Sequence, residues 1–86
     1  MDIALNLLPV NKKGRVAKIE ACGKEKRRML DLGIVEGTEI EAVQKSPMGD
    51  PVAYLFRGTV IALREEDASK VTVTVTDSIN QAYIWL

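Results

Sequence analysis

The segment from residue 27 to residue 40 constrains the fold most, because it ends a helix and begins a strand. Its sequence is RRMLDLGIVEGTEI. Gly33 stands where a helix needs a left-handed residue, a conformation that glycine adopts without the steric penalty of a Cβ atom. Met29 and Ile34 then form the hydrophobic contact that accompanies a Schellman cap. Gly37 allows a turn, and the alternation of polar and apolar residues after it predicts a strand.

Short strand-like stretches make up most of the remaining sequence. We expect strands over 15–21, 38–45, 52–57, 59–64 and 71–76, a helix over 24–32 and a helical turn over 65–68. Gly58 joins two of these strands into a hairpin. Residues 3–8 fit a short helical turn or an extended arm packed on the core. The pattern predicts a mainly β fold, a small and partly open barrel of about five strands with one helix after the first strand.

Three details of the strands follow from the same pattern. Residues 10–14 are polar and predict a loop. In the first strand, alternation places Ala17, Ile19 and Ala21 on one face. Val43 interrupts the alternation of its strand and indicates a β-bulge.

Composition is that of one small globular domain. The chain has 86 residues, 47% of them hydrophobic, and twelve basic residues balance twelve acidic ones. A zero net charge gives no general attraction to nucleic acid or anionic lipid, so we predict no nucleic-acid partner. The single cysteine, Cys22, excludes an internal disulfide. No stretch resembles a secretory leader or a membrane span, so we expect a cytoplasmic protein that reaches a membrane only through a partner.

The chain lacks the side chains on which most enzymes depend. It contains no histidine, so Cys22 has no imidazole to activate it as a nucleophile. Iron sites draw on imidazole, thiolate and carboxylate ligands, and here the carboxylates are spread along the chain. We therefore predict a protein that is not an enzyme, holds no cofactor or metal, and acts through contacts. The carboxylates in question are Asp31, Glu36, Glu39 and Glu41.

The basic helix is the strongest predicted surface feature. Residues 24–28 carry four basic side chains and one acidic side chain, whereas residues 31–41 carry four acidic side chains and no basic one. Such polarity can orient a partner, although a solvated helix face explains the same residues. We expect the exposed helix face and the turn after it to bind a partner. The candidate partner-binding residues are Lys26, Arg27, Val35, Glu36 and Gly37.

The same region carries a family resemblance. The pattern Arg28-x-Leu30-Asp31-Leu32-Gly33-Ile34-x-x-Gly37-Thr38-x-Ile40 is similar to the signature of the FeoA family of ferrous-iron-transport accessory proteins. Gly49-Asp50-Pro51, Arg57-Gly58 and the segment from Ile61 to Val73 resemble the second half of that pattern in the same order. The resemblance implies an SH3-like barrel with the helix inserted after the first strand. The motif residues expected to determine the fold are Arg28, Leu30, Asp31, Leu32, Gly33, Gly37 and Gly58.

The resemblance also implies a function. FeoA proteins assist the FeoB-type ferrous iron permease, a membrane protein with a cytosolic G domain. We therefore expect an accessory protein that binds the G domain or the cytoplasmic surface of the permease and tunes its nucleotide-dependent gating. Two alternatives stay open: a regulatory module like the C-terminal SH3-like domain of iron-dependent repressors, and a freestanding structural domain that associates with itself.

The end of the chain departs from the family pattern. We divide the sequence into a barrel domain over residues 1–75 and an apolar extension over residues 76–86, which ends in AYIWL. An exposed apolar stretch tends to find a surface. We expect the extension to pack on the barrel or on a second copy, by adding a strand to an open edge, and so to make a homo-oligomer in the second case.

Overall fold

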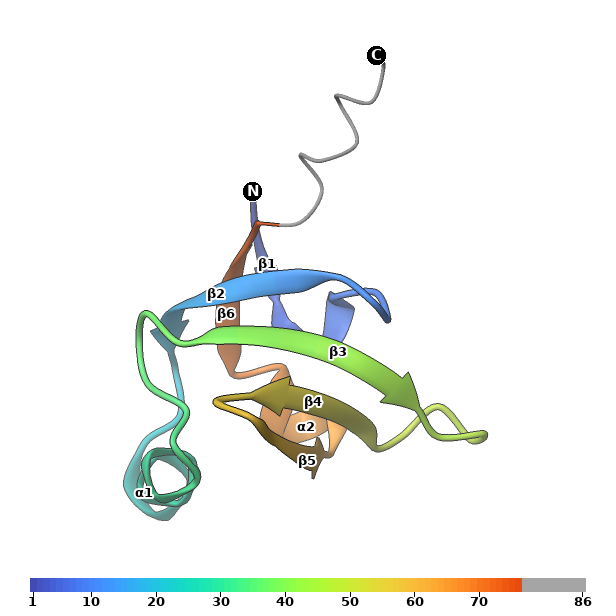
Figure 1. The fold of residues 1–86 in the computed structure, drawn as a ribbon. Coiled ribbons are helices and arrows are strands. Elements are labelled where there is room, and N and C mark those ends of the chain that lie inside the picture. The colour runs from blue at the N-terminus through green and yellow to red at the C-terminus, as the bar shows by residue number, and fades with distance from the viewer. Residues whose placement is uncertain (77–86) are drawn as a thin grey trace.

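The computed structural model describes residues 1–76, which form one antiparallel sheet of six strands in the order β1-β6-β2-β3-β4-β5. Figure 1 shows β2 and β3 running across the middle, the β4–β5 hairpin below them and α1 standing at one end. The predicted mainly β architecture is confirmed. The elements are β1 (Asp2–Ala4), the 3-10 turn η1 (Leu5–Leu7), β2 (Lys13–Ile19), α1 (Gly23–Leu32), β3 (Glu39–Lys45), β4 (Val52–Phe56), β5 (Thr59–Leu63), α2 (Glu65–Ala68) and β6 (Val71–Val75).

The first strand of the sheet was not predicted as a strand. Residues 3–8, expected to be a helical turn or an extended arm, contain the end of β1 and all of η1. β1 pairs with β6, with Ile3 opposite Val73. Because its partner lies at the other end of the chain, three residues of local sequence do not reveal the strand. The helix α1 follows the strand predicted over residues 15–21, as expected, and that strand is β2 because β1 precedes it.

The loop predicted over residues 10–14 is shorter than expected, because β2 already begins at Lys13. Gly14 is a buried strand residue, and a Cβ atom built on it would lie 3.1 Å from the Cβ and Cγ2 atoms of Val73. Glycine here allows two strands to approach closely. The packing of β2 against β6 therefore requires a residue without a side chain at this position.

Two β-bulges bend the sheet. The register of β2 against β6 shifts between Val16 and Lys18, so Ala17 is exposed on the strand. Simple alternation predicted that Ala17 and Ala21 share a buried face. They do not, because the extra residue at the bulge reverses the alternation. The second bulge lies between Ala42 and Gln44 of β3, and the predicted bulge at Val43 is confirmed.

The core fills the concave side of the bent sheet and the space beneath the end of α1. The two aromatic residues of β4, Tyr54 and Phe56, point inward and are 1% and 2% exposed. The hydroxyl of Tyr54 donates a hydrogen bond of 3.4 Å to the carbonyl oxygen of Leu5 in η1. The other large buried side chains are Leu5, Leu8, Val16, Met29, Ile34, Ile40, Leu63, Val71 and Val73.

The predicted helix cap is confirmed. Gly33 has a φ of 97°, in the left-handed region. The Ile34 amide donates to the Met29 carbonyl oxygen at 3.0 Å, and the Gly33 amide donates to the Leu30 carbonyl oxygen at 2.9 Å. These are the two hydrogen bonds of a Schellman motif, and the side chains of Met29 and Ile34 are both buried.

Candidate partner-binding surface

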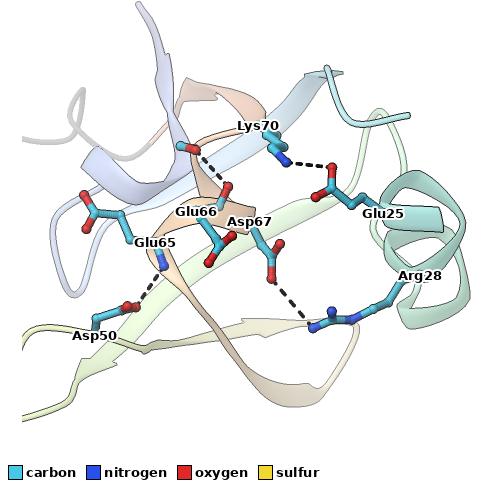
Figure 2. Close-up of polar contacts among 8 residues, drawn as sticks. Glu25, Arg28, Asp50, Glu65, Glu66, Asp67 and Lys70 are labelled. Carbon is cyan, nitrogen blue, oxygen red and sulfur yellow. Dashed lines mark hydrogen bonds and ion pairs between the residues drawn. The ribbon is translucent and has the colours of Figure 1, made fainter. Parts of the chain in front are cut away.

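The helix α1 is held against the barrel by its apolar end and by two ion pairs. Met29 is buried, and Leu32 packs against the core from the same side. The Lys70 Nζ atom lies 2.6 Å from the Glu25 Oε1 atom, and the Arg28 Nη2 atom lies 3.6 Å from the Asp67 Oδ2 atom. Figure 2 shows both pairs joining α1 to the segment that contains α2. We call them the helix-anchoring ion pairs, because they join α1 to the segment between α2 and β6.

The helix α2, which contains Asp67, is itself held in place by a residue of a neighbouring loop. α2 begins at Glu65, whose amide donates to the Asp50 Oδ1 atom at 2.8 Å. This side-chain oxygen satisfies one of the free N–H groups at the start of the helix. Figure 2 shows Asp50 approaching Glu65 from the loop before β4. Loop, α2 and α1 are thus linked by a series of polar contacts.

The hydrogen bond between Lys70 and Glu25 raises the pKa of the Lys70 ammonium, with the negative charges of Glu25, Asp67 and Glu66 adding to it. The shift is the expected response of a cation to acceptors and opposite charges. Lys70 therefore stays charged over the physiological pH range.

The basic cluster predicted from the sequence is divided by this arrangement. Arg28 turns toward Asp67, whereas Lys26 and Arg27 are exposed and form no ion pair within residues 1–76. Leu30, grouped above with the residues that determine the fold, is 46% exposed. It stands four positions after Lys26 and three after Arg27, so the three side chains are neighbours on one helix face. We call Lys26, Arg27 and Leu30 the outer face of α1.

The turn after the helix is rigidly attached to the sheet. Gly37 has a φ of 91°, and its amide donates to the Val16 carbonyl oxygen of β2 at 2.8 Å. The Thr38 Oγ1 atom accepts a hydrogen bond of 3.3 Å from the Val35 amide. Glu36 and Gly37 are exposed, and Val35 is half-buried. Figure 1 shows this turn on the same side of the molecule as α1.

The acidic residues of β3 face basic residues of β2. Glu41 stands opposite Lys13, and Glu39 stands opposite Arg15. Both glutamates border a cleft of about 190 Å³, which Lys13 of β2 and Arg57 of the hairpin also line. The cleft therefore has balanced charge. In the part of the chain that the structure describes, no three cysteine, aspartate or glutamate side chains come together as a metal site would require.

Sequence reasoning found the free cations of α1 but not the residues that orient the helix. Asp67 and Lys70 lie far from α1 in the chain, and no local pattern marks them as its partners. Among residues 1–76, no helix combines the length and apolar character needed to cross a bilayer.

The sequence profile of the FeoA domain matches residues 3–75. The chain belongs to the FeoA domain family. The predicted family is confirmed, and the match includes α1, the turn after it, the strands from β2 to β6 and the last two residues of β1.

Relatives of this FeoA domain include free-standing and fused proteins. An Fe(2+) transport protein A/FeoB fusion protein of Porphyromonas gingivalis is 36% identical over 63 residues, which are 73% of this chain and 8% of that protein. The FeoA-like protein of Clostridium acetobutylicum is 40% identical, with a TM-score of 0.80 and 86% of each chain covered. FeoA of Stenotrophomonas maltophilia, solved with zinc and described as an SH3 domain protein, is 31% identical with a TM-score of 0.72, over 85% of this chain and 88% of that one. The SH3-like fold is therefore confirmed.

The same fold occurs in metal-dependent repressors. The crystal structure of T. acidophilum IdeR has a TM-score of 0.78 over 87% of this FeoA domain and 34% of that chain. Sequence identity is 21%, so the likeness concerns the fold alone.

Proposed function

We propose that this FeoA domain is a non-enzymatic, cytoplasmic accessory protein of ferrous iron uptake that binds an FeoB-type permease and modulates it. The observation that carries the proposal is the fusion protein of P. gingivalis, in which a related segment and FeoB share one chain. Covalent fusion keeps two proteins at high effective concentration, which benefits partners that contact each other. The matched segment is 8% of that fusion protein, so the permease makes up part of a much longer chain there.

The outer face of α1 is the part of the surface best suited to the contact. Lys26 and Arg27 have no acidic partner within residues 1–76, so their charges are available to an acidic surface. Leu30, one helical turn further along, offers an apolar side chain that stabilises a complex when a partner covers it. Long-range attraction by the cations would set the encounter rate, and burial of the leucine would lengthen the lifetime of the complex.

The turn at Val35, Glu36 and Gly37 supplies the second part of the proposed contact. Its hydrogen bonds to β2 and within the turn fix its shape before any partner arrives. A preformed turn loses little conformational entropy on binding. We propose that the turn determines the orientation of the partner, whereas the outer face of α1 provides most of the affinity.

Action through contacts agrees with the available side chains. The chain has no histidine, and its one cysteine is exposed and stands at the start of α1 without a side-chain capping bond. General acid–base and thiol chemistry thus lack their commonest participants. Because the G domain of the permease is cytosolic, the proposed site of action is the cytoplasm.

Binding to the isolated G domain of an FeoB-type permease tests the proposal. Arg27→Glu reverses one charge of the outer face and should weaken binding at least tenfold, measured by titration calorimetry. Lys45→Glu is the matched control, because Lys45 is an exposed cation at the end of β3. Figure 1 shows that β3 ends on the side of the molecule away from α1.

The outcomes separate the possible roles. Selective loss of binding in Arg27→Glu supports the outer face of α1 as the contact. Equal loss in both variants indicates general charge attraction and contradicts the assigned surface. Absence of binding by the unmodified chain, to the G domain and to the full permease alike, rejects the accessory role.

A further inference from the structure

The strand β5 is an open edge of the sheet. It pairs with β4 on one side, and it is the last strand in the sheet order. Figure 1 shows β5 at the lower border of the sheet, remote from the end of β6. An unpaired edge presents N–H and C=O groups that can bind another strand.

The hairpin geometry identifies these free backbone groups. Arg57 and Gly58 form a two-residue turn with φ values of 53° and 76°, so Phe56 and Thr59 are the first hydrogen-bonded pair. Hydrogen-bonded and non-hydrogen-bonded pairs alternate along an antiparallel ladder. The backbone groups of Val60 and Ala62 therefore point away from β4, toward the open edge.

The edge lacks three of the common protections against pairing. Proteins protect edge strands with charged side chains, prolines or bulges. β5 reads TVIAL, without a charge or a proline, and its register with β4 is regular. Val60 is 58% exposed, and Ala62 is also exposed. An uncharged and regular edge with an exposed valine is typical of a strand that has a partner.

The outer side chains of the hairpin form a small aliphatic patch around this edge. Val60 stands opposite Leu55, and Ala62 stands opposite Ala53, all on the face that points away from the core. Tyr54 and Ile61 lie on the other face, toward the core. A strand added to β5 would therefore meet both free backbone groups and apolar side chains.

We propose that the occupant of this edge is β5 of a second copy of the chain. The two strands run antiparallel around a two-fold axis at Ile61. Val60 of each copy then faces Ala62 of the other, and these pairs exchange backbone hydrogen bonds because both residues present their N–H and C=O groups to the edge. The contact is self-complementary, as a two-fold dimer requires.

Side chains favour a second copy over an unrelated strand. The outer face becomes one aliphatic row, from Leu55 and Val60 to Ala62 and Ala53 of the second copy.

The proposed dimer is weak, because it rests on one short strand pair and a few aliphatic side chains. Interfaces below about 1,200 Å² of buried surface belong to transient complexes. We therefore expect monomers at micromolar concentration and dimers as the concentration approaches the millimolar range, measured by sedimentation equilibrium.

Two variants test the edge by different means. Ala62→Pro removes the N–H group that points away from β4 and so leaves the β4–β5 ladder intact. Val60→Lys adds a charge to the edge. Both should abolish the concentration-dependent rise in mass, while circular dichroism confirms folding. Leu7→Lys is the matched control, because Leu7 is 64% exposed on η1 and should leave the dimer unchanged.

A chain that stops at Thr76 separates this proposal from strand addition by the apolar extension. The shortened chain should still dimerise, with slower exchange of the Val60 and Ala62 amide protons at high concentration. A monomer at all concentrations overturns the proposal, as does dimerisation that survives both β5 variants. Dimerisation lost on truncation but kept in Val60→Lys would identify the extension as the occupant and overturn it too.

Discussion

Lys70 and Glu25 are 45 residues apart in the chain, yet their side chains meet at 2.6 Å. The contact joins the residue before β6 to the first turn of α1, so the helix is attached to the sheet at both of its ends. The Schellman cap holds the other end through Gly33 and Ile34. The orientation of the outer face of α1 depends on both attachments.

Reversal of one charge in this pair should loosen the helix. Lys70→Glu places two carboxylates together, and we expect faster amide hydrogen exchange over residues 24–28 with little change elsewhere. Glu25→Lys in the same chain restores opposite charges and should restore protection. Equal exchange rates in wild type and Lys70→Glu would show that the apolar end of α1 holds it alone.

The cap of α1 predicts a selective effect of substitution at Gly33. A Cβ atom there would lie 3.8 Å from the nearest atom of Phe56, so space is available and backbone conformation decides the cost. Gly33→Val should lower the free energy of unfolding by more than about 1 kcal/mol, because β-branched residues disfavour positive φ. Gly33→Asn is the control and should cost less, since asparagine tolerates the left-handed region. Equal denaturation midpoints in the two variants would argue against the backbone explanation.

The close approach of β2 and β6 at Gly14 predicts a steric effect. Gly14→Ala brings a methyl group against Val73 and should destabilise the domain by about 1–3 kcal/mol, as overpacking usually does. Combining it with Val73→Ala should cost less than the sum of the single changes, because the second substitution makes room. Strict additivity in chemical denaturation would mean that another contact opposes the new methyl group.

The buried phenol of Tyr54 predicts a loss of stability in alkali. Burial, and then the negative charge of Asp50, raises the pKa of Tyr54 to about 12. The unfolded chain ionises near pH 10, so the folded state must hold the phenol neutral above that pH. The phenol of Tyr54 therefore leaves the free energy of unfolding unchanged below about pH 10, and it lowers that free energy as the pH rises from about 10 toward 12.

Tyr54→Phe should flatten that alkaline loss. The hydroxyl makes a long hydrogen bond to Leu5, so the change should cost no more than about 1 kcal/mol at neutral pH. Lys70 titrates in both proteins, so its contribution to the pH dependence of stability is the same and cancels from the comparison. Parallel plots of unfolding free energy against pH for wild type and Tyr54→Phe would contradict the role given to burial.

Local interactions made part of this structure predictable. The cap at Gly33 and its contact between Met29 and Ile34 lie within one short segment, and the hairpin at Gly58 and the bulge at Val43 are local as well. In the same way, the charges of Lys26 and Arg27 mark an exposed helix face from sequence alone.

Long-range partners explain what was missed. β1 becomes a strand because β6 pairs with it, and Gly14 belongs to a strand because Val73 packs against it. Arg28 appeared to belong to the free basic cluster, and only its position near Asp67 shows otherwise. These outcomes depend on how the sheet closes, which no short segment of sequence contains.

The pairing of β1 with β6 also has a consequence for synthesis. The Met1 carbonyl oxygen accepts a hydrogen bond from the Val75 amide, so the beginning of the chain is bound by its last strand. A nascent chain can form the β3–β4–β5 meander on the ribosome, but its N-terminal residues must wait for residue 75 to emerge. Pairing of β1 with β6 is therefore a late event of translation. Until residue 75 has left the exit tunnel, β1 has no partner strand.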